Sequence, residues 1–227
     1  MTEAAITLSV GLTSAREQMI QQQLRTWEVL DSEVLQVFET LDRERFVPEA
    51  YHSLAYADLA IPLGQGHYML APKLVGRIVQ AVKPGPRDRV LEIGTGSGYL
   101  TAALARLACS VRTIEIRADQ ASRAQASLKE SGIRNVEVVT GDAYAEGSLG
   151  ERLYDVVVVG GALAEREPRF EAKVAIGGRL FAVMGQGSIM TAMLYEHVSA
   201  GEWRQTELFE TALETLVGAR LPSRFKF

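Results

Sequence analysis

The sequence predicts an α/β fold in which a doubly wound, mostly parallel sheet carries an N-terminal helical extension and a C-terminal antiparallel edge pair. From about residue 84, short apolar runs alternate with helical stretches, an order typical of parallel strands connected by helices. Before that point, residues 14–41 place apolar side chains at three-to-four spacing. The last apolar runs are separated only by a short turn at Ala200-Gly201, which favours an antiparallel pair.

The N-terminal part is predicted to be helical up to a long connecting segment. Residues 14–41 are expected to form two helices, and Asp31 or Ser32 would cap the second. The stretch 51–69 shows no clear periodicity, so it is predicted to be a functional loop and not a plain linker. Pro72 fits the first turn of the helix that follows.

The rest of the chain is expected to form the sheet. We divide the protein into an N-terminal helical extension with an active-site loop, residues 1–83, and an α/β domain, residues 84–227, which together form one compact unit. Strands are predicted at 89–93, 111–115, 136–139, 155–159 and 179–184, helices near 98–107, 118–131 and 165–175, and the edge pair at 193–199 and 202–209.

Composition excludes several classes of function. The 227-residue chain has a formal net charge of −4, which disfavours a broad nucleic-acid-binding surface. Residues 1–13 lack a positively charged region before their apolar residues, and no segment approaches ~20 uncharged apolar residues, so a cytoplasmic protein without membrane contact is expected. The single cysteine, Cys109, excludes an internal disulfide and is predicted to be a small core residue. No cluster has metal-ligand spacing, so no metal is expected.

A glycine-rich turn between a strand and a helix predicts a nucleotide site. Residues 94–98, Gly-Thr-Gly-Ser-Gly, follow an apolar strand, and the next helix would point its free N–H groups at a ligand in the turn. The dinucleotide fingerprint requires a small residue where this chain has Tyr99, which weakens a nicotinamide interpretation, and no Gly-Lys-Ser/Thr follows. The remaining pattern, Glu-x-Gly-x-Gly-x-Gly with Glu92 inside the strand, resembles the first motif of class I S-adenosylmethionine-dependent methyltransferases.

Acidic residues after the next two strands support this cofactor. Glu115 ends the second strand of the sheet, where it would accept hydrogen bonds from both ribose hydroxyls. Asp142 follows the third strand and would accept one from the adenine amino group. Either residue alone is better explained as a helix cap or a solvated loop charge, but the glycine turn and the two acidic residues at the ends of three successive strands together favour cofactor binding.

The ordered motifs resemble those of the protein-L-isoaspartate O-methyltransferase family, which has the Rossmann-like class I methyltransferase fold. The resemblance extends from Met19 to Phe227. It is carried by residues 19–25, 45–48, 55–58, 61–64, 90–99, 135–136, 141–142, 154–155 and 177–180. It implies S-adenosyl-L-methionine as cofactor, with S-adenosyl-L-homocysteine as product. The predicted cofactor site comprises Gly66, Met69, Glu92, Gly94, Thr95, Gly96, Ser97, Gly98, Tyr99, Glu115, Asp142 and Ala143.

Two departures from the family pattern lie where the resemblance places the substrate. The family loop Gly-Gln-Thr-Ile-Ser-Gln-Pro is Gly-His-Tyr-Met-Leu-Ala-Pro here, at residues 66–72. Leu70 therefore takes the position of the functional serine, and Tyr68 that of the threonine. The family signature Val-Thr-Ala-Ala is Val-Gly-Gly-Ala at residues 159–162. Hydroxyl groups are thus missing at three positions.

The residues that remain suggest how an acceptor would be held. A carboxylate nucleophile is already ionised at neutral pH, so methyl transfer to it needs positioning and no general base. Tyr68 would supply a phenolic donor or pack as a lid, and His67 would orient a nucleophile, act as a base for a neutral acceptor, or face solvent. These two are the catalytic candidates. Leu70, Gly160 and Gly161 are the substrate-site candidates, and the glycines either leave room for a larger acceptor or only let the chain turn.

The resemblance implies an O-methyltransferase that methylates isoaspartyl carboxylates in damaged proteins, a protein-repair activity. Two alternatives stay open, namely the same cofactor with another acceptor, and a non-catalytic S-adenosylmethionine-binding protein. The expected partner is a protein or peptide substrate, or a small molecule, with no nucleic acid and no membrane. Nothing in the sequence indicates an oligomeric state.

Overall fold

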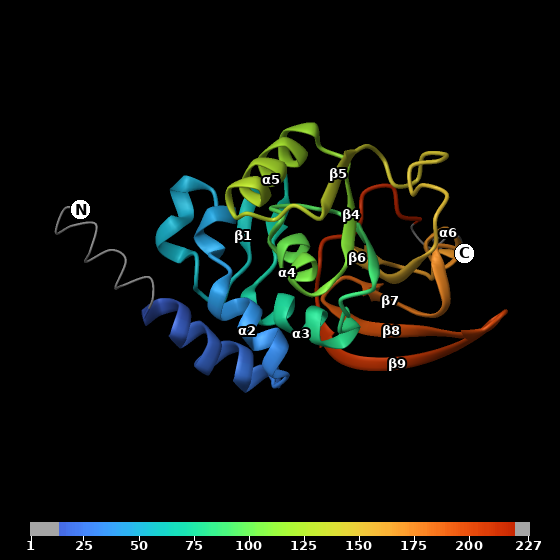
Figure 1. Ribbon diagram of the computed structural model, residues 1–227, viewed down its shortest axis with the longest axis horizontal. Coiled ribbons are helices and arrows are strands. Elements are labelled where there is room, and N and C mark those ends of the chain that lie inside the picture. The colour runs from blue at the N-terminus through green and yellow to red at the C-terminus, as the bar shows by residue number, and fades with distance from the viewer. Residues whose placement is uncertain (1–13, 221–227) are drawn as a thin grey trace, which may run out of the picture.

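A seven-stranded sheet with the order β5-β4-β3-β6-β7-β8-β9 forms the centre of the computed structural model, which describes residues 14–220 (Figure 1). The pairs from β5 to β7 are parallel, and β8 and β9 add to the β7 edge in antiparallel orientation. The predicted fold class is therefore confirmed. Residues 1–13, on which part of the cytoplasmic expectation depends, lie outside the described residues. The strands are β3 (Arg89–Ile93), β4 (Ser110–Glu115), β5 (Val136–Thr140), β6 (Tyr154–Leu163), β7 (Val174–Gln186), β8 (Ile189–Ser199) and β9 (Glu202–Thr211).

Helices cover one face of the sheet, and a short helix with a long connection covers the other. The first face carries α2 (Ser32–Thr40), α3 (Pro72–Val82), α4 (Tyr99–Leu107) and α5 (Ala118–Glu130), together with a π-helical segment, Met19–Leu24. Side chains of both predicted parts of the chain, such as Phe38 and Leu104, belong to the same buried cluster. The second face packs Phe170 and Leu149 against the sheet.

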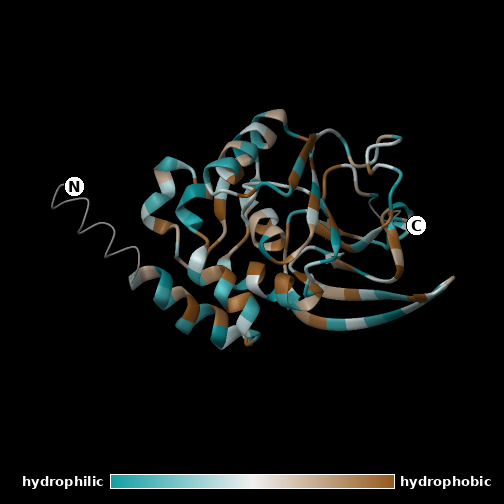
Figure 2. Cartoon of the chain, viewed as in Figure 1, coloured by the Kyte–Doolittle hydropathy of each residue, from teal (hydrophilic) through white to brown (hydrophobic). Residues whose placement is uncertain are grey.

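The second N-terminal helix, α2, begins where the sequence predicts. Asp31 caps α2, because its carboxylate accepts hydrogen bonds from the backbone N–H groups of Glu33 and Val34. Figure 2 shows hydrophilic and hydrophobic residues alternating along these helices and along β8 and β9. That alternation is expected where one side of an element faces the core and the other faces water.

The predicted helix at 165–175 is much shorter than expected. The α6 helix covers only Pro168–Glu171, because the chain enters β7 at Val174, which pairs with Tyr154 of β6. The sequence hides the start of β7, since Gly177 adopts a positive φ of 82° and interrupts the alternating pattern.

The segment predicted as an irregular loop contains regular structure. Strands β1 (Ile61–Gly64) and β2 (His67–Met69) form an antiparallel hairpin after two short 3₁₀ turns, Arg43–Phe46 and Glu49–Leu54. Gln65 and Gly66 both have positive φ, 53° and 78°, as a type I′ hairpin turn requires. Strands of three and four residues are too short to produce a recognisable period.

The prediction that Cys109 is a core residue is wrong. The side chain is exposed, because residue 109 lies in the turn between α4 and β4. Among residues 14–220, no group of three or more His, Cys, Asp or Glu side chains is arranged to hold a metal ion. None of the helices in the same range combines the length and apolarity that crossing a membrane requires.

Candidate functional site

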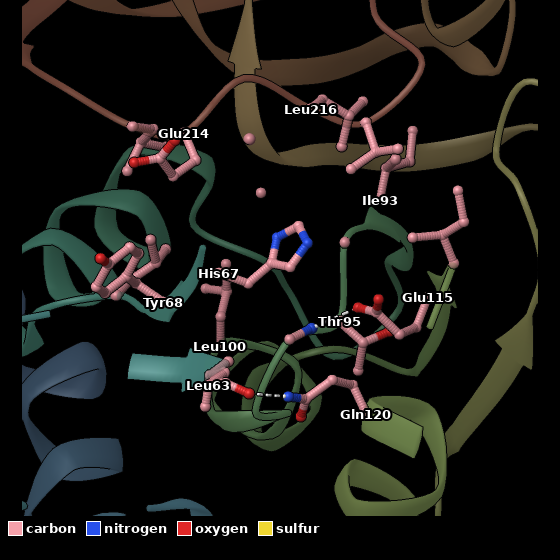
Figure 3. A pocket seen from close by; sticks show the side chains of 18 of the residues that line it. Leu63, His67, Tyr68, Ile93, Thr95, Leu100, Glu115, Gln120, Glu214 and Leu216 are labelled. Atoms are coloured by element: carbon pink, nitrogen blue, oxygen red, sulfur yellow. Dashed lines mark hydrogen bonds between the residues drawn. The ribbon is translucent and has the colours of Figure 1, made fainter. Parts of the chain in front are cut away.

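A cavity of about 590 Å³ lies at the carboxyl ends of β3, β4 and β6, where ligands bind in sheets of this type (Figure 3). It brings together most of the predicted site residues from both parts of the chain. Those in its wall are His67, Tyr68, Met69, Leu70, Gly94, Thr95, Gly96, Ser97, Tyr99, Glu115, Asp142, Ala143, Gly160 and Gly161. Gly66, Glu92 and Gly98 are not in the wall.

The glycine turn forms the floor of the cavity. Gly94, Gly96 and Gly98 have φ values of 90°, 53° and 85°, which side chains with a β-carbon rarely adopt. A β-carbon on Gly98 would also lie 3.1 Å from the β-carbon of Ala124 on α5. Gly98 is therefore the N-cap of α4 and permits close helix packing, whereas Gly94 and Gly96 face the cavity.

Glu115 is buried beside this turn in a fixed orientation. One carboxylate oxygen accepts a hydrogen bond from the backbone N–H of Gly96 at 2.8 Å, and the other accepts one from that of Arg117 at 3.0 Å. The side chain is only 6% exposed. On the next strand end, Asp142 accepts a hydrogen bond from the N–H of Tyr144 at 2.8 Å. Two carboxylates thus lie in the same wall of the cavity, as the strand order predicts.

Glu92 lies behind the turn and not in the cavity. Successive residues of a strand point to opposite faces, and Glu92 points toward α4, where its carboxylate accepts a hydrogen bond from the Thr101 hydroxyl at 2.5 Å. Complete burial raises its pKa to about 7. A neighbouring buried hydrogen bond joins the hydroxyls of Thr95 and Thr113 at 2.7 Å. These two buried hydrogen bonds connect the turn and the elements on either side of it, and so support the glycine turn on the side away from the cavity.

The β1–β2 hairpin carries the acceptor-side residues and is anchored by α5 and the loop before it. Gln120 donates a hydrogen bond to the carbonyl of Leu63 at 2.7 Å, and Arg117 donates one to that of Gly64 at 3.0 Å. Figure 3 shows the His67 ring projecting into the middle of the cavity, with Tyr68 on one side. Tyr68 is 46% exposed. Gly66 lies at the hairpin turn, outside the wall.

The C-terminal segment 212–217 forms a part of the wall that sequence reasoning missed. After β9 the chain runs back along β6. The Ala162 N–H donates to the Glu214 carbonyl at 2.8 Å, and the Leu216 N–H donates to the Ala162 carbonyl at 2.9 Å. Thr215 and Ala162 form a parallel bridge. No local pattern marks this segment, because its structure depends on pairing with a distant strand.

The two glycines after β6 lie against backbone. A β-carbon on Gly160 would come within 2.8 Å of the Gly94 carbonyl oxygen. One on Gly161 would lie 2.9 Å from the α-carbon of Leu216. Close packing of the chain, and not room for a larger acceptor, therefore accounts for both glycines.

The acceptor end of the cavity is largely apolar. Leu70, Val75, Met190 and Leu213 contribute to its wall. His67, Tyr68 and Glu214 add polar side chains to the same wall. Arg117 also lines the cavity, but its guanidinium is engaged with Gly64 and with Asp119, at 3.0 Å from each. An apolar wall with a few polar groups can exclude water and orient a small polar acceptor.

Comparisons with known proteins identify the family to which the chain belongs. The family model for protein-L-isoaspartate(D-aspartate) O-methyltransferase matches residues 14–220. A protein-L-isoaspartate O-methyltransferase of Koribacter versatilis is 36% identical over 208 residues, covering 92% of this chain and 93% of the relative. One from Methanoculleus marisnigri is 38% identical over 170 residues, covering 75% and 77% of the two chains.

Solved structures show the same fold. A protein-L-isoaspartate O-methyltransferase superposes with a TM-score of 0.76 at 24% identity, covering 89% of this chain and 66% of the other. A Plasmodium falciparum protein described by the same family name, in complex with S-adenosyl-L-homocysteine, gives a TM-score of 0.75 at 20% identity, covering 90% and 97%. The near-complete family match and the 36% identical relative decide the assignment. The chain belongs to the protein-L-isoaspartate(D-aspartate) O-methyltransferase family, as its sequence motifs predict.

Proposed function

We propose that this protein transfers a methyl group from S-adenosyl-L-methionine to the side-chain carboxylate of an isoaspartyl residue in a damaged protein or peptide. The proposal is supported by one cavity that joins two ends of different chemistry. One end has the glycine turn with Glu115 and Asp142, and the other has the hairpin residues His67 and Tyr68. Family membership supplies the reaction class that fits this arrangement.

The cofactor end fits S-adenosylmethionine by its donors and by its shape. Glu115 and Asp142 are acceptors suited to ribose hydroxyls and an adenine amino group. Ile116, next to Glu115, is an apolar side chain that is 42% exposed, which favours contact with a flat base. The glycine turn leaves backbone exposed where a β-carbon would otherwise project. When bound there, the cofactor supplies an electrophilic methyl group on a sulfonium.

The chain's own residues then have to hold the acceptor. A carboxylate needs no proton removed at neutral pH, so correct placement carries the catalysis, and tight placement is worth up to ~7–11 kcal/mol of barrier. His67 and Tyr68 are proposed to donate hydrogen bonds to the acceptor carboxylate in place of the family hydroxyls. Leu70 and the apolar wall exclude water around it.

We further propose a division of work within one compact unit. Residues 84–227 hold the cofactor, and residues 1–83 supply the hairpin to the acceptor side, where Met190, Leu213 and Glu214 complete the wall. Tyr68 and Glu214 are exposed and line the cavity, so an extended peptide segment can reach them.

A radiolabel transfer assay tests the function. We expect methyl incorporation into an isoaspartyl peptide, far above that into the same peptide with normal aspartate, and inhibition by S-adenosyl-L-homocysteine. Equal incorporation into the two peptides would overturn the repair function. Tight binding of S-adenosyl-L-homocysteine with no transfer to either peptide, or to other carboxyl and hydroxyl acceptors, would instead favour a binding protein.

A further inference from the structure

A buried arginine lies between the acceptor hairpin and the cofactor turn. Arg43, the first residue of the 3₁₀ turn Arg43–Phe46, has no exposed surface. Its Nε donates a hydrogen bond to the Ala55 carbonyl at 2.7 Å, and its Nη2 donates one to the Leu70 carbonyl at 2.8 Å. The guanidinium also lies over the ring of Tyr99, 4.7 Å from its centroid.

The charge of Arg43 is not neutralised by a carboxylate among residues 14–220. Its two acidic neighbours are committed elsewhere: Asp42 pairs with Arg16 and Arg45, and Glu44 accepts a hydrogen bond from Tyr56. Burial lowers the pKa of Arg43 to about 10, so the guanidinium stays protonated at neutral pH.

A buried cation without a carboxylate partner lowers the stability of the folded protein. Removing an ion from water carries a large desolvation penalty, and an apolar side chain of similar volume often serves the fold equally well. The Nη1 atom of Arg43 even lacks a hydrogen-bond partner within the described structure. The arrangement therefore calls for a role that an apolar residue cannot fill.

The contacts of Arg43 indicate that role, because they join the two ends of the cavity. Leu70 lines the acceptor end and directly precedes Ala71, the N-cap of α3. Tyr99 is the first residue of α4, directly after the glycine turn, and also lines the cavity. One planar guanidinium thus touches both.

We propose that Arg43 is a positioning residue that fixes the hairpin's Leu70 end relative to the cofactor turn, and so sets the spacing between acceptor and methyl donor. In-line methyl transfer is sensitive to that spacing, since a misplacement of about 1 Å can cost roughly a hundredfold in rate. This role rests on the proposed function, and it predicts an effect on acceptor handling that exceeds the effect on cofactor binding.

Other contacts of Tyr99 and of the hairpin explain why loss of Arg43 should affect acceptor handling more than cofactor binding. Tyr99 is also packed against Phe38 and Phe46, with ring centroids 6.2 Å and 5.6 Å away, so the cofactor turn keeps its support without Arg43. The other end of the hairpin stays fastened by Gln120 and Arg117. Loss of Arg43 therefore releases the Leu70 end first.

The test compares Arg43→Lys and Arg43→Met in the full-length protein. Lysine keeps the charge but lacks the planar fork that reaches two carbonyls at once. We expect kcat/KM for the isoaspartyl peptide to fall roughly tenfold or more in both variants. Calorimetric Kd values for S-adenosyl-L-homocysteine should change less than about threefold, and amide hydrogen exchange in residues 67–71 should accelerate.

Arg45→Lys is the matched control, because Arg45 lies in the same turn but pairs with Asp42 at the surface. It should leave all three measurements near wild type. Unchanged exchange at 67–71 in Arg43→Lys, or a loss of S-adenosyl-L-homocysteine affinity as large as the loss of acceptor turnover, overturns the positioning role. If Arg43→Met does not fold, Arg43→Lys alone decides. If the wild-type protein transfers no methyl group, the proposed function is refuted. Amide hydrogen exchange and S-adenosyl-L-homocysteine binding in the Arg43 variants still test the positioning role.

Discussion

Gly161 and Leu216 pack backbone against backbone. They lie so close that a β-carbon at residue 161 would be 2.9 Å from the α-carbon of Leu216. This contact lets the C-terminal segment run beside β6 and complete the cavity wall. The site therefore depends on a glycine that contributes no side chain to chemistry.

Gly161→Ala should push the C-terminal segment away from β6. The added methyl group collides with backbone that cannot rotate aside, so we expect the free energy of unfolding to fall by about 1–3 kcal/mol. Affinity for S-adenosyl-L-homocysteine, measured by calorimetry, should fall with it. Gly85→Ala is the control, since a β-carbon there meets only Asp88 at 3.9 Å. A folded Gly161→Ala protein with wild-type affinity would contradict this role for the segment.

Glu115→Gln should weaken cofactor binding. The carboxylate accepts hydrogen bonds from two backbone N–H groups, those of Gly96 and Arg117, and an amide would turn a donor toward one of them. Hydrogen bonds to charged groups are worth ~1.5–3 kcal/mol, so the Kd for S-adenosyl-L-homocysteine should rise by about tenfold to a hundredfold. Glu130→Gln, on the exposed face of α5, should leave the Kd unchanged. Equal Kd values for the two variants would show that Glu115 is not part of the cofactor site.

Glu92 should make stability depend on pH. Burial raises its pKa from 4.5 to about 7, so the folded protein binds this proton more tightly than the unfolded chain does. The contribution to stability is therefore present below about pH 4.5 and is lost as the pH rises toward 7, on the order of 3 kcal/mol in total. Urea unfolding from pH 4.5 to 8 should show this decline relative to Glu92→Gln. Parallel curves for the two proteins would refute the raised pKa.

Restoring hydroxyls to the acceptor loop should improve turnover of the isoaspartyl peptide. In the Tyr68→Thr, Leu70→Ser double variant, the threonine hydroxyl replaces the donor proposed for Tyr68 and the serine adds a second one, and about 1.4 kcal/mol gained in the transition state gives roughly a tenfold rise in kcat/KM. The Tyr68→Val, Leu70→Ala variant has nearly the same shape without hydroxyls. If both double variants behave alike, the change in side-chain size and not the hydroxyl groups is responsible.

Glu214 should make the enzyme favour basic substrates. Its exposed carboxylate lines the acceptor end, where it attracts a Lys beside the isoaspartyl residue and repels a Glu. Exposed pairs are worth ~0.2–1 kcal/mol, so the Lys-flanked peptide should have a KM up to about fivefold lower. The preference should disappear in Glu214→Gln and reverse in Glu214→Lys. A preference that is unaffected by these changes, or by high salt, does not come from Glu214.

The sequence predicted those parts of the site that depend on strand order. Parallel strands end at the same edge of a sheet, so residues just after β3, β4 and β5 must lie close together. The structure accordingly places the glycine turn, Glu115 and Asp142 around one cavity. The apolar runs were equally informative about the sheet, because buried parallel strands are apolar on both faces.

The parts that were missed depend on contacts between distant segments. The short hairpin is held by Gln120 and Arg117, and the segment 212–217 by its pairing with Ala162. Neither leaves a periodic pattern. Glu92 resembles a ligand residue in the motif, yet the alternation of the strand turns it toward Thr101. Cys109 is exposed because it lies in the turn between α4 and β4, and its neighbouring apolar residues do not show where that turn begins.

The position of the segment 212–217 has a consequence for biosynthesis. These residues follow every strand of the sheet, so they leave the ribosome after the glycine turn, the hairpin and both acidic strand ends. We expect a nascent chain to form most of the sheet while its cavity still lacks this wall. Competence for cofactor binding should therefore appear late in synthesis, when Leu216 reaches Ala162, and not gradually as the chain grows.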